Sequence, residues 1–254
     1  MKNGTNFCVA LLFALSLVIL PYRAFAFFGV EVGVGSWRQS PSGTLSYQPL
    51  AATDTLDLKN DLHFDDKSKV FGRAKLELPL VLPNIYAMAT PMSFEGTGSR
   101  TVNYGGHSFS GSYSTKLKLD HYDLALYYPI PLLKTATLGK LNVELGLNGR
   151  QINYESTLAS PTISASKTLT IYVPMVYLGA QVKPVSAFAI EAEIRGIAYG
   201  SSHYYDYLGR LKITPFGPLF IGAGYRSEQM KIDQSGVKAD VKFSGPFVEA
   251  GLSF

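Results

Sequence analysis

Apolar residues alternate with polar or small residues along most of this chain. At positions 248–254 the even-numbered residues, from Val248 to Phe254, are apolar, whereas Glu249, Gly251 and Ser253 lie between them. The segment 28–35 repeats the pattern, with phenylalanine or valine at even positions and glycine or glutamate at odd positions. A period of two residues indicates a β-strand, because successive side chains of a strand point to opposite faces.

The alternation predicts about ten strands. They cover residues 28–35, 72–78, 85–94, 117–128, 141–150, 172–182, 188–195, 205–213, 219–226 and 237–254. Pro174 and Pro246 fall inside two of these strands. We expect bulges or strand ends there, because proline cannot donate to the hydrogen-bond ladder of a sheet.

The connections between the predicted strands alternate in length. Those near residues 80, 130, 184 and 216 are compact and rich in proline. The segments 39–67, 95–114 and 156–167 are predicted to be long polar loops, with shorter ones near residues 201 and 235. Short turns on one side and longer loops on the other are typical of outer-membrane β-barrels. An even number of strands places both ends of the domain on the short-turn side, which is periplasmic in such proteins.

The two faces of the strands favour a membrane barrel over a soluble sandwich. One face stays apolar along nearly every strand, and the opposite face carries repeated long charged side chains. Outward aromatic residues gather near the strand ends, as in the two interfacial girdles of a membrane barrel. They are Phe28, Tyr128, Phe188 and Phe254 on the turn side and Tyr122, Tyr172, Tyr205 and Tyr225 on the loop side. We therefore predict an all-β fold, a closed antiparallel transmembrane β-barrel of about ten strands, with eight as the alternative.

The N-terminal segment has the three parts of a secretory signal peptide. Lys2 supplies the positive charge, residues 7–20 form an uncharged apolar run, and Ala24-Phe25-Ala26 is a small-x-small cleavage site. The apolar run is shorter than the roughly 20 residues that a membrane-spanning helix needs. We expect cleavage after Ala26, which removes residues 1–26 and leaves residues 27–254 as one barrel domain.

Composition excludes several classes of function. The only cysteine, Cys8, lies in the predicted signal peptide, so the barrel domain has no disulfide or thiol chemistry. The formal net charge of +4 includes Lys2 and Arg23 of that peptide, so the remaining domain is close to neutral and we expect no nucleic-acid partner. The four histidines show no metal-ligand spacing, and we expect neither a metal nor a cofactor.

The C-terminal strand resembles the assembly signal of bacterial outer-membrane barrels, a last strand with an aromatic end that the barrel assembly machinery recognises. Its outward residues are Val248, Ala250, Leu252 and Phe254. The glycine-rich first strand, Trp37, the Ser-Pro-Ser-Gly-Thr-Leu segment at 40–45 and the Leu-Pro-Asn turn at 82–84 resemble a family of small proteobacterial outer-membrane β-barrels without an assigned function. We expect a monomer in the outer membrane of a Gram-negative cell envelope, in contact with its lipids and lipopolysaccharide.

The inward faces of the predicted strands carry charges of both signs. The acidic residues are Glu31, Glu77, Asp123, Glu144, Glu191, Glu193, Glu228 and Glu249, and the basic residues are Arg73, Lys75, Arg150, Arg195, Arg210, Lys212 and Arg226. A barrel of this size is little wider than one that side chains fill, and charges in a narrow space need partners. We predict that a network of Glu144, Arg150, Glu191, Glu193, Arg195, Arg210 and Lys212 closes the lumen, with Glu193 opposite Arg210 or Lys212.

A closed lumen favours a structural or surface-binding barrel whose long polar loops are the binding surfaces. A narrow, porin-like pore for small solutes or hydrophobic molecules is the alternative. A rim hydrolase is a further alternative, because the omptin proteases are ten-strand barrels that use Asp/Asp and Asp/His pairs at the outer rim. The candidate pairs here are Asp65 with Asp66, Asp120 with His121, and His203 with Asp206.

Catalysis by such a pair requires a carboxylate that orients a histidine as a general base. The match to the omptins extends only to residue types. Barrels that modify lipid A acyl chains need a Ser/His pair that faces lipid, whereas His121 is predicted to point inward. We therefore expect no enzyme activity and assign no catalytic residue.

Overall fold

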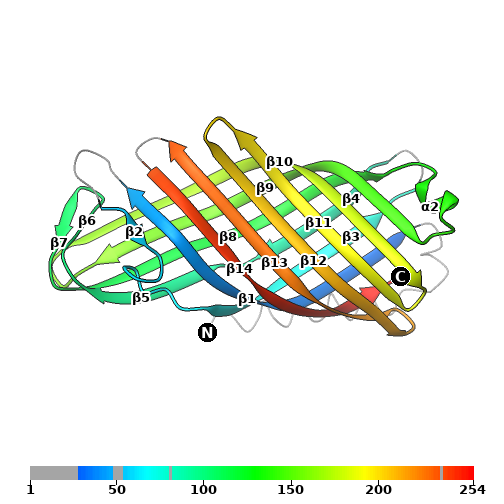
Figure 1. The fold of residues 1–254 in the computed structure, drawn as a ribbon, viewed down its shortest axis with the longest axis horizontal. Helices are drawn as coiled ribbons and strands as arrows, with labels where there is room; N and C mark the ends of the chain where they lie inside the picture. Colours follow the sequence, from blue (N-terminus) through cyan, green and yellow to red (C-terminus); the bar gives the residue numbers. More distant parts are fainter. Residues whose placement is uncertain (1–27, 48–53, 80–81, 235–236) are drawn as a thin grey trace.

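The computed structural model describes residues 28–47, 54–79, 82–234 and 237–254. The predicted signal peptide, residues 1–26, lies outside this part of the chain. The described residues form an antiparallel sheet that closes on itself, because the last strand, β14 (Val237–Ser253), pairs with the first, β1 (Gly29–Tyr47). Figure 1 shows the resulting barrel with its strongly tilted strands. Within the described segments, no helix is long and apolar enough to cross a membrane.

Within the described residues, the wall of the barrel has ten strands. After β1 they are β3 (Lys67–Glu77), the interrupted strand β4 (Asn84–Thr90) and β5 (Ser93–Ser99), β8 (Ser112–Pro129), β9 (Leu141–Ala159), β10 (Ser164–Val185), β11 (Phe188–Tyr199), β12 (Ser202–Phe216), β13 (Leu219–Gln234) and β14. Each pairs with its neighbours in this order. The prediction of a closed antiparallel barrel with ten strands is confirmed, and the eight-strand alternative is wrong.

Both ends of the wall lie on the side of the short turns. The backbone N–H groups of Val30 and Phe254 each donate to the other residue's carbonyl oxygen, at 3.3 and 2.8 Å. This end also carries the helix α2 (Leu133–Ala136) and the turn between β12 and β13 (Figure 1). The opposite end carries β2 (Leu56–Asp57) and a hairpin of β6 (Val102–Tyr104) and β7 (His107–Phe109).

The outward face of the wall has an apolar belt next to the short turns. On β8 the belt consists of Tyr122, Leu124, Leu126 and Tyr128, all about half exposed. Other strands contribute Val32, Val34, Leu145, Leu147, Tyr172, Val176, Leu178, Ile190, Ile194, Leu211, Ile213, Ile221, Tyr225 and Val248. An exposed apolar surface of this extent requires a nonaqueous environment, and outer-membrane barrels present such a band to lipid.

The polar segments that were predicted as loops are mostly strands, so these predictions are wrong. β1 continues to Tyr47, β9 continues to Ala159, and β10 begins at Ser164, so that the wall extends far beyond the apolar belt. Within the segment 95–114, β5 runs to Ser99 and β8 begins at Ser112. The predicted strand 85–94 is in turn interrupted at residues 91–92, between β4 and β5.

A change of phase along the strands explains these errors. In the outer half of β8, Leu117 and Leu119 are buried in the lumen while Lys116 and Lys118 point outward. In the half of β8 that carries the apolar belt, which we call the belt half, the apolar residues lie on the other face, and Leu124 points outward. Apolar residues inside and polar residues outside are the ordinary pattern of a sheet in water. The outer half of the wall is therefore built as a water-soluble sheet that continues a membrane-type sheet.

The lumen of this outer half is filled by an apolar core. Residues 54–66, which precede β3, fold into the mouth of the barrel, where the Thr115 hydroxyl donates to the Leu62 carbonyl at 2.8 Å. The β6–β7 hairpin packs beside this segment. The first segment buries Leu56, Leu58, Leu62 and Phe64. The hairpin buries Val102, Tyr104 and Phe109. The predicted surface loops thus close the barrel from inside.

Gly43 on β1 adopts a backbone conformation that favours glycine. Its φ angle is +101°, and a Cβ at this position would lie 2.0 Å from the carbonyl oxygen of Asp240. We expect Gly43→Ala to lower the free energy of unfolding by at least ~1–2 kcal/mol, the cost of a left-handed backbone for a residue with a Cβ.

Gly72→Ala is the matched control, because a Cβ at Gly72 meets no atom within 4 Å. Urea unfolding in lipid vesicles, followed by the fluorescence of the single tryptophan, Trp37, measures both variants. Equal urea midpoints for the two variants would contradict the expected strain at Gly43.

Candidate functional site

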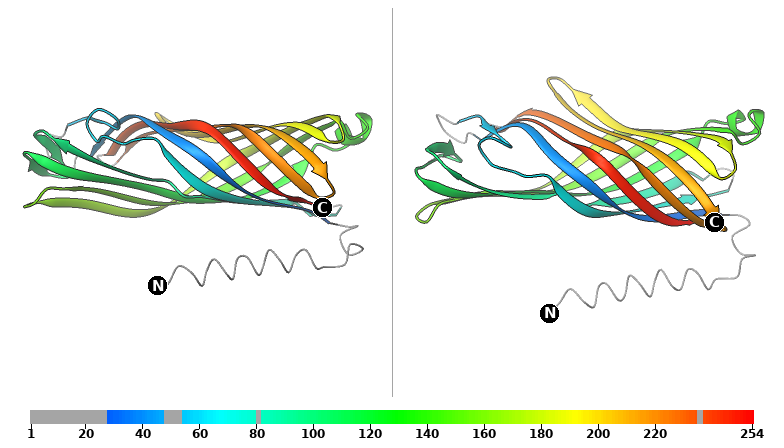
Figure 2. Two further views of the ribbon diagram at one scale, coloured as in Figure 1. Left: turned by 90° about the horizontal axis from the view of Figure 1, so that it is seen from below. Right: turned by 60° about the horizontal axis from the view of Figure 1, so that its bottom comes forward.

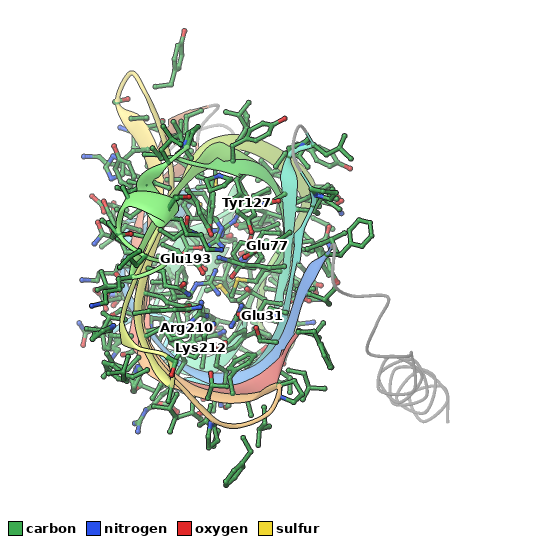
Figure 3. The ribbon with its side chains drawn as sticks, turned by 90° about the vertical axis from the view of Figure 1, so that its right-hand side faces the viewer. Glu31, Glu77, Tyr127, Glu193, Arg210 and Lys212 are labelled. Atoms are coloured by element: carbon green, nitrogen blue, oxygen red, sulfur yellow. The ribbon has the colours of Figure 1, made fainter. Side chains whose placement is uncertain are left out.

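The belt half of the lumen holds a network of buried ion pairs. Figure 3, a view into the barrel from the end that carries α2, shows Glu31, Glu193, Arg210 and Lys212 in the interior. The members are the carboxylates Glu31, Asp123, Glu144, Glu191, Glu193, Asp206, Glu228 and Glu249 and the cations Arg73, Lys75, Arg150, Arg195, Arg210, Lys212 and Arg226. Eight carboxylates thus face seven cations in a space that excludes most water.

Asp206 on β12 is a central member of this network and is completely buried. Its carboxylate accepts hydrogen bonds from Arg150 at 2.5 Å and from Arg226 at 2.8 Å, and it lies 3.5 Å from Arg195. Arg150 also donates two hydrogen bonds to Asp123, at 2.8 and 2.9 Å. Two parallel N–H···O bonds between arginine and a carboxylate form the strongest type of ion pair in proteins.

The outer limit of the network is formed by Glu228, His121 and Trp37. Glu228 lies 2.6 Å from Arg226 and 3.2 Å from the Nε2 atom of His121. The guanidinium of Arg226 lies 4.8 Å from the centre of the Trp37 ring, and the Trp37 indole N–H donates to the Gly245 carbonyl at 3.1 Å. Trp37 thus separates the charged part of the lumen from the apolar core beyond it.

Closer to the short turns, Arg210 and Arg73 share the carboxylate of Glu249. Arg73 donates two bonds to Glu249 at 2.9 Å each, and Arg210 donates one at 3.0 Å. Arg210 also pairs with Glu191 and lies 3.2 Å from Glu193. These residues come from β3, β11, β12 and β14, so the contacts link strands from different parts of the wall.

The turn end of the lumen opens into a polar hollow of about 210 Å³. Lys75 and Glu144 lie at its inner limit, 3.3 Å apart, and the Tyr177 hydroxyl donates to Glu144 at 3.0 Å. Glu77 is predicted to face the lumen, but it lines this hollow as an exposed side chain at the mouth. The hollow therefore ends at the ion-pair network.

Comparison with solved structures finds the same fold in OmpT and more distant similarity to other proteins. The outer-membrane protease OmpT from Escherichia coli matches with a TM-score of 0.55 and 8% identity, over 90% of this chain and 97% of that chain. Ail, the attachment invasion locus protein of Yersinia pestis, gives a TM-score of 0.40 at 10% identity, over 90% of this chain and 99% of that one. A FadL homologue from Pseudomonas aeruginosa gives 0.33 at 9% identity, over 90% of each chain. No family model and no curated protein matches the chain.

The match to OmpT concerns the fold alone, and the closed barrel with its outward apolar belt decides the location. The chain is a bacterial outer-membrane β-barrel. The short turns of such barrels face the periplasm, so α2 and Phe254 lie on the periplasmic side and the outer half projects from the cell. The ion-pair network therefore lies at the depth of the membrane, and the apolar core lies outside it.

The outer-membrane barrel brings all seven residues of the predicted network into the lumen. Glu193 lies 3.2 Å from Arg210, as predicted. It is not directly opposite Arg210, however: on β12 the residue opposite Glu193 is Leu208, and the residue opposite Arg210 is Glu191. Sequence analysis missed Asp206 as a network member and placed it in a rim pair. The alternation along β12 was the available signal. Asp206 lies two residues before Leu208 and four before Arg210, so it shares their inward face.

Two of the candidate rim pairs are separated by the wall itself. Asp120 accepts a hydrogen bond from the Met92 backbone N–H at 2.9 Å and is half-buried, whereas His121 points into the lumen towards Glu228. His203 is half-buried near the outer end of β12, whereas Asp206 is completely buried in the lumen. In neither pair does the carboxylate orient the histidine.

The third candidate pair, Asp65 with Asp66, lies at the outer end of the barrel. Asp66 lies 3.3 Å from Arg38 and 3.5 Å from Lys59. A hydrogen bond with the Ser40 hydroxyl, together with these two cations, lowers the pKa of Asp66 below its usual value. In the described part of the chain, no group of three or more His, Cys, Asp or Glu side chains is arranged to hold a metal ion.

The residues of the predicted assembly signal share the outward face of β14. Val248 and Ala250 are exposed, and Leu252 and Phe254 are half-buried at the periplasmic end. They would be accessible to another protein before the barrel enters the membrane. Their recognition by the assembly machinery stays a prediction.

Proposed function

We propose that this outer-membrane barrel is closed to solutes, has no enzyme activity, and serves a structural or surface-binding role. The observation that carries the proposal is the reach of the ion pairs across the lumen. Lys75 of β3 contacts Glu144 of β9, and Arg226 of β13 donates to Thr90 of β4 at 2.9 Å. In the order of the wall these strands are not neighbours, so the contacts bridge the interior.

The energetics of buried charge favour a network that stays intact. A charge removed from water costs several kcal/mol unless partners compensate it, and here Asp206 and Glu249 each contact two or more arginines. The hollow between the network and the apolar core measures about 10 Å³, close to the minimum that holds one water molecule. A continuous water path would have to separate these pairs.

The outer end offers surfaces for a binding role. Two hollows of about 590 and 600 Å³ adjoin there and share His63 and Thr97 as lining residues, and the second of them is mainly polar. Arg38 and Lys59 line the second hollow. A polar ligand, including the head group of lipopolysaccharide, would find both hydrogen-bond donors and hydrogen-bond acceptors at this end. We propose that the protein acts as a monomer and enters the membrane through the barrel assembly machinery.

Planar-bilayer recording of the purified protein tests the closed lumen. We expect no steady conductance, because the ion pairs and the apolar core fill the lumen in series. Recovery of folded protein from the same bilayer lipids, seen as a band that shifts when the gel sample is heated, is the control for insertion. Steady channels from inserted wild-type protein would overturn the proposal and favour the narrow pore.

A further inference from the structure

The wall of the barrel is incompletely paired between β10 and β11. These strands pair from the periplasmic turn as far as Val176, which lies opposite Gly196. Beyond that point β10 continues to Ser164 beside β9, and β11 continues to Tyr199 beside β12. No strand in the described segments pairs with the edge of β10 beyond Val176. The right view of Figure 2 shows the β11–β12 hairpin diverging from β9 and β10.

A hollow of about 590 Å³ lies where the pairing stops. Its lining includes Pro174, Val176 and Ile194 from the outward faces and Met175 and Ile197 from the inward faces. Met175 and Ile197 are the first residues beyond the last pair, Val176 with Gly196, so the hollow lies at the gap where the two strand edges part. We call it the β10–β11 slot.

The slot connects two apolar regions. On the outside it continues the lipid-facing belt, to which Val176 and Ile194 belong. On the inside, Met175 belongs to the buried hydrophobic cluster of the lumen, and Val173 and Ile197 pack against it. Asn148 also lines the slot and donates to Asp123 at 2.7 Å, so a hydrocarbon chain that passes from the belt towards this cluster meets the ion-pair network only at the Asn148 amide.

The slot lies at the depth of the outer leaflet. Tyr172 on β10 and Tyr205 on β12 belong to the outer aromatic girdle, and Val176 lies on the periplasmic side of Tyr172 along β10. The ring of Tyr205 flanks the slot, because a Cβ on Gly196 would lie 2.5 Å from it. Where β10 and β11 diverge, backbone N–H groups lose their strand partners within the membrane. Pro174 has no N–H group, so there is one such donor fewer.

We propose that the β10–β11 slot binds one acyl chain of an outer-leaflet membrane lipid. The chain lies between the strands and reaches Met175 and Ile197. The ester and head group lie at the level of Tyr172, where the free edge of β10 offers N–H and C=O groups that need polar partners. An amphiphile fits this arrangement better than a pure hydrocarbon, because the free edge of β10 needs hydrogen-bond partners and the adjacent slot is apolar. The inference goes beyond the proposed function and does not depend on whether the lumen conducts.

Photo-cross-linking in vesicles tests the slot. The full barrel is reconstituted in phosphatidylcholine that contains a small fraction of phosphatidylcholine with a diazirine on one acyl chain, and adducts are located by mass spectrometry. We expect adducts on the inward residues Met175 and Ile197 in addition to the outward belt. Met88, an inward methionine of β4 that is equally buried, is the internal control and should carry none.

Two tryptophan variants on the outward face of β11 complete the test. Ala198 lines the slot, whereas Ala192 lies on the same face within the paired part of the strand. We expect Ala198→Trp to lower the yield of adducts on Met175 about tenfold, as a loss of ~1.4 kcal/mol in binding would. Ala192→Trp should leave the yield unchanged.

Adducts confined to outward residues in the wild-type protein would overturn the proposal, and this result does not depend on the folding of any variant. Equal loss of adducts in both variants would also overturn it, because it would indicate general contact with lipid. Cross-links from the free edge of β10 to a second copy of the chain, in place of lipid adducts on Met175, would show that another strand covers the slot and would refute lipid binding.

Discussion

Asp206→Ala is expected to lower the free energy of unfolding by about 3–5 kcal/mol, the usual cost of removing one partner from a buried ion pair. The substitution leaves Arg150, Arg195 and Arg226 in the lumen without the carboxylate that they share. All three guanidinium groups are at most 1% exposed, so water does not replace the lost partner. The urea concentration at which the folded gel band disappears measures the effect.

Two variants serve as controls for Asp206→Ala. Asp206→Asn keeps the shape and some hydrogen bonds but loses the charge, so we expect an intermediate loss of stability. Asp240→Ala removes an exposed carboxylate whose distance to Lys231 is 4.0 Å, and exposed pairs contribute only about 0–1 kcal/mol. Similar urea midpoints for Asp206→Ala and Asp240→Ala would show that the network does not stabilise the barrel.

Trp37→Ala is expected to cost about 3–5 kcal/mol, the range for deletion of a fully buried large aromatic side chain. Trp37 is 0% exposed and lies between the guanidinium of Arg226 and the apolar core. Its removal leaves a cavity at this boundary and uncovers the charge of Arg226. The result would be an unfolding transition at much lower urea, again read from the folded gel band because the variant has no tryptophan.

Trp37→Phe separates the contributions of ring packing and hydrogen bonding. It keeps an aromatic face over Arg226 but loses the indole N–H that donates to Gly245, so we expect a smaller cost of about 1–3 kcal/mol for the unpaired carbonyl and the reduced volume. If Trp37→Ala and Trp37→Phe were equally stable, contact between the ring and its surroundings would have no measurable role.

The belt half of the barrel was predictable from the sequence because its two faces differ strongly. Leu124 and Leu126 face lipid while Asp123 faces the lumen, and this contrast repeats on most strands. The same alternation predicts which charges point inward. It also predicts the closed barrel, because lipid offers no hydrogen-bond partners to the open edge of a sheet.

The height of the barrel was not predictable in this way. Around Asp120 and His121 on β8, the apolar residues move from the inward to the outward face without a break in the strand. A pattern search reads such a change of phase as the end of a strand. The polar outward residues beyond it, such as Lys116 and Lys118, then look like part of a loop.

The members of the ion-pair network were largely predictable, whereas their partners were not. Position along a strand places Arg73 and Lys75 inside the barrel. Their contacts with Glu249 and Glu144 depend on how the closed wall brings distant strands face to face, and no local pattern encodes this. Asp206 was missed although it lies inside the predicted strand 205–213, because it was assigned to a rim pair with His203.

The ionic half and the apolar half of the lumen respond to temperature in the same direction, for different physical reasons. Hydrophobic stabilisation weakens on cooling, whereas the penalty for keeping ions out of water falls as temperature rises. Cooling should therefore loosen the core around Leu58 and Phe64 outside the membrane, while warming favours the ion pairs around Asp206 within it. The two trends have the same sign, so both contributions weaken as the temperature falls, and cooling should loosen the ionic half and the apolar half of the lumen together.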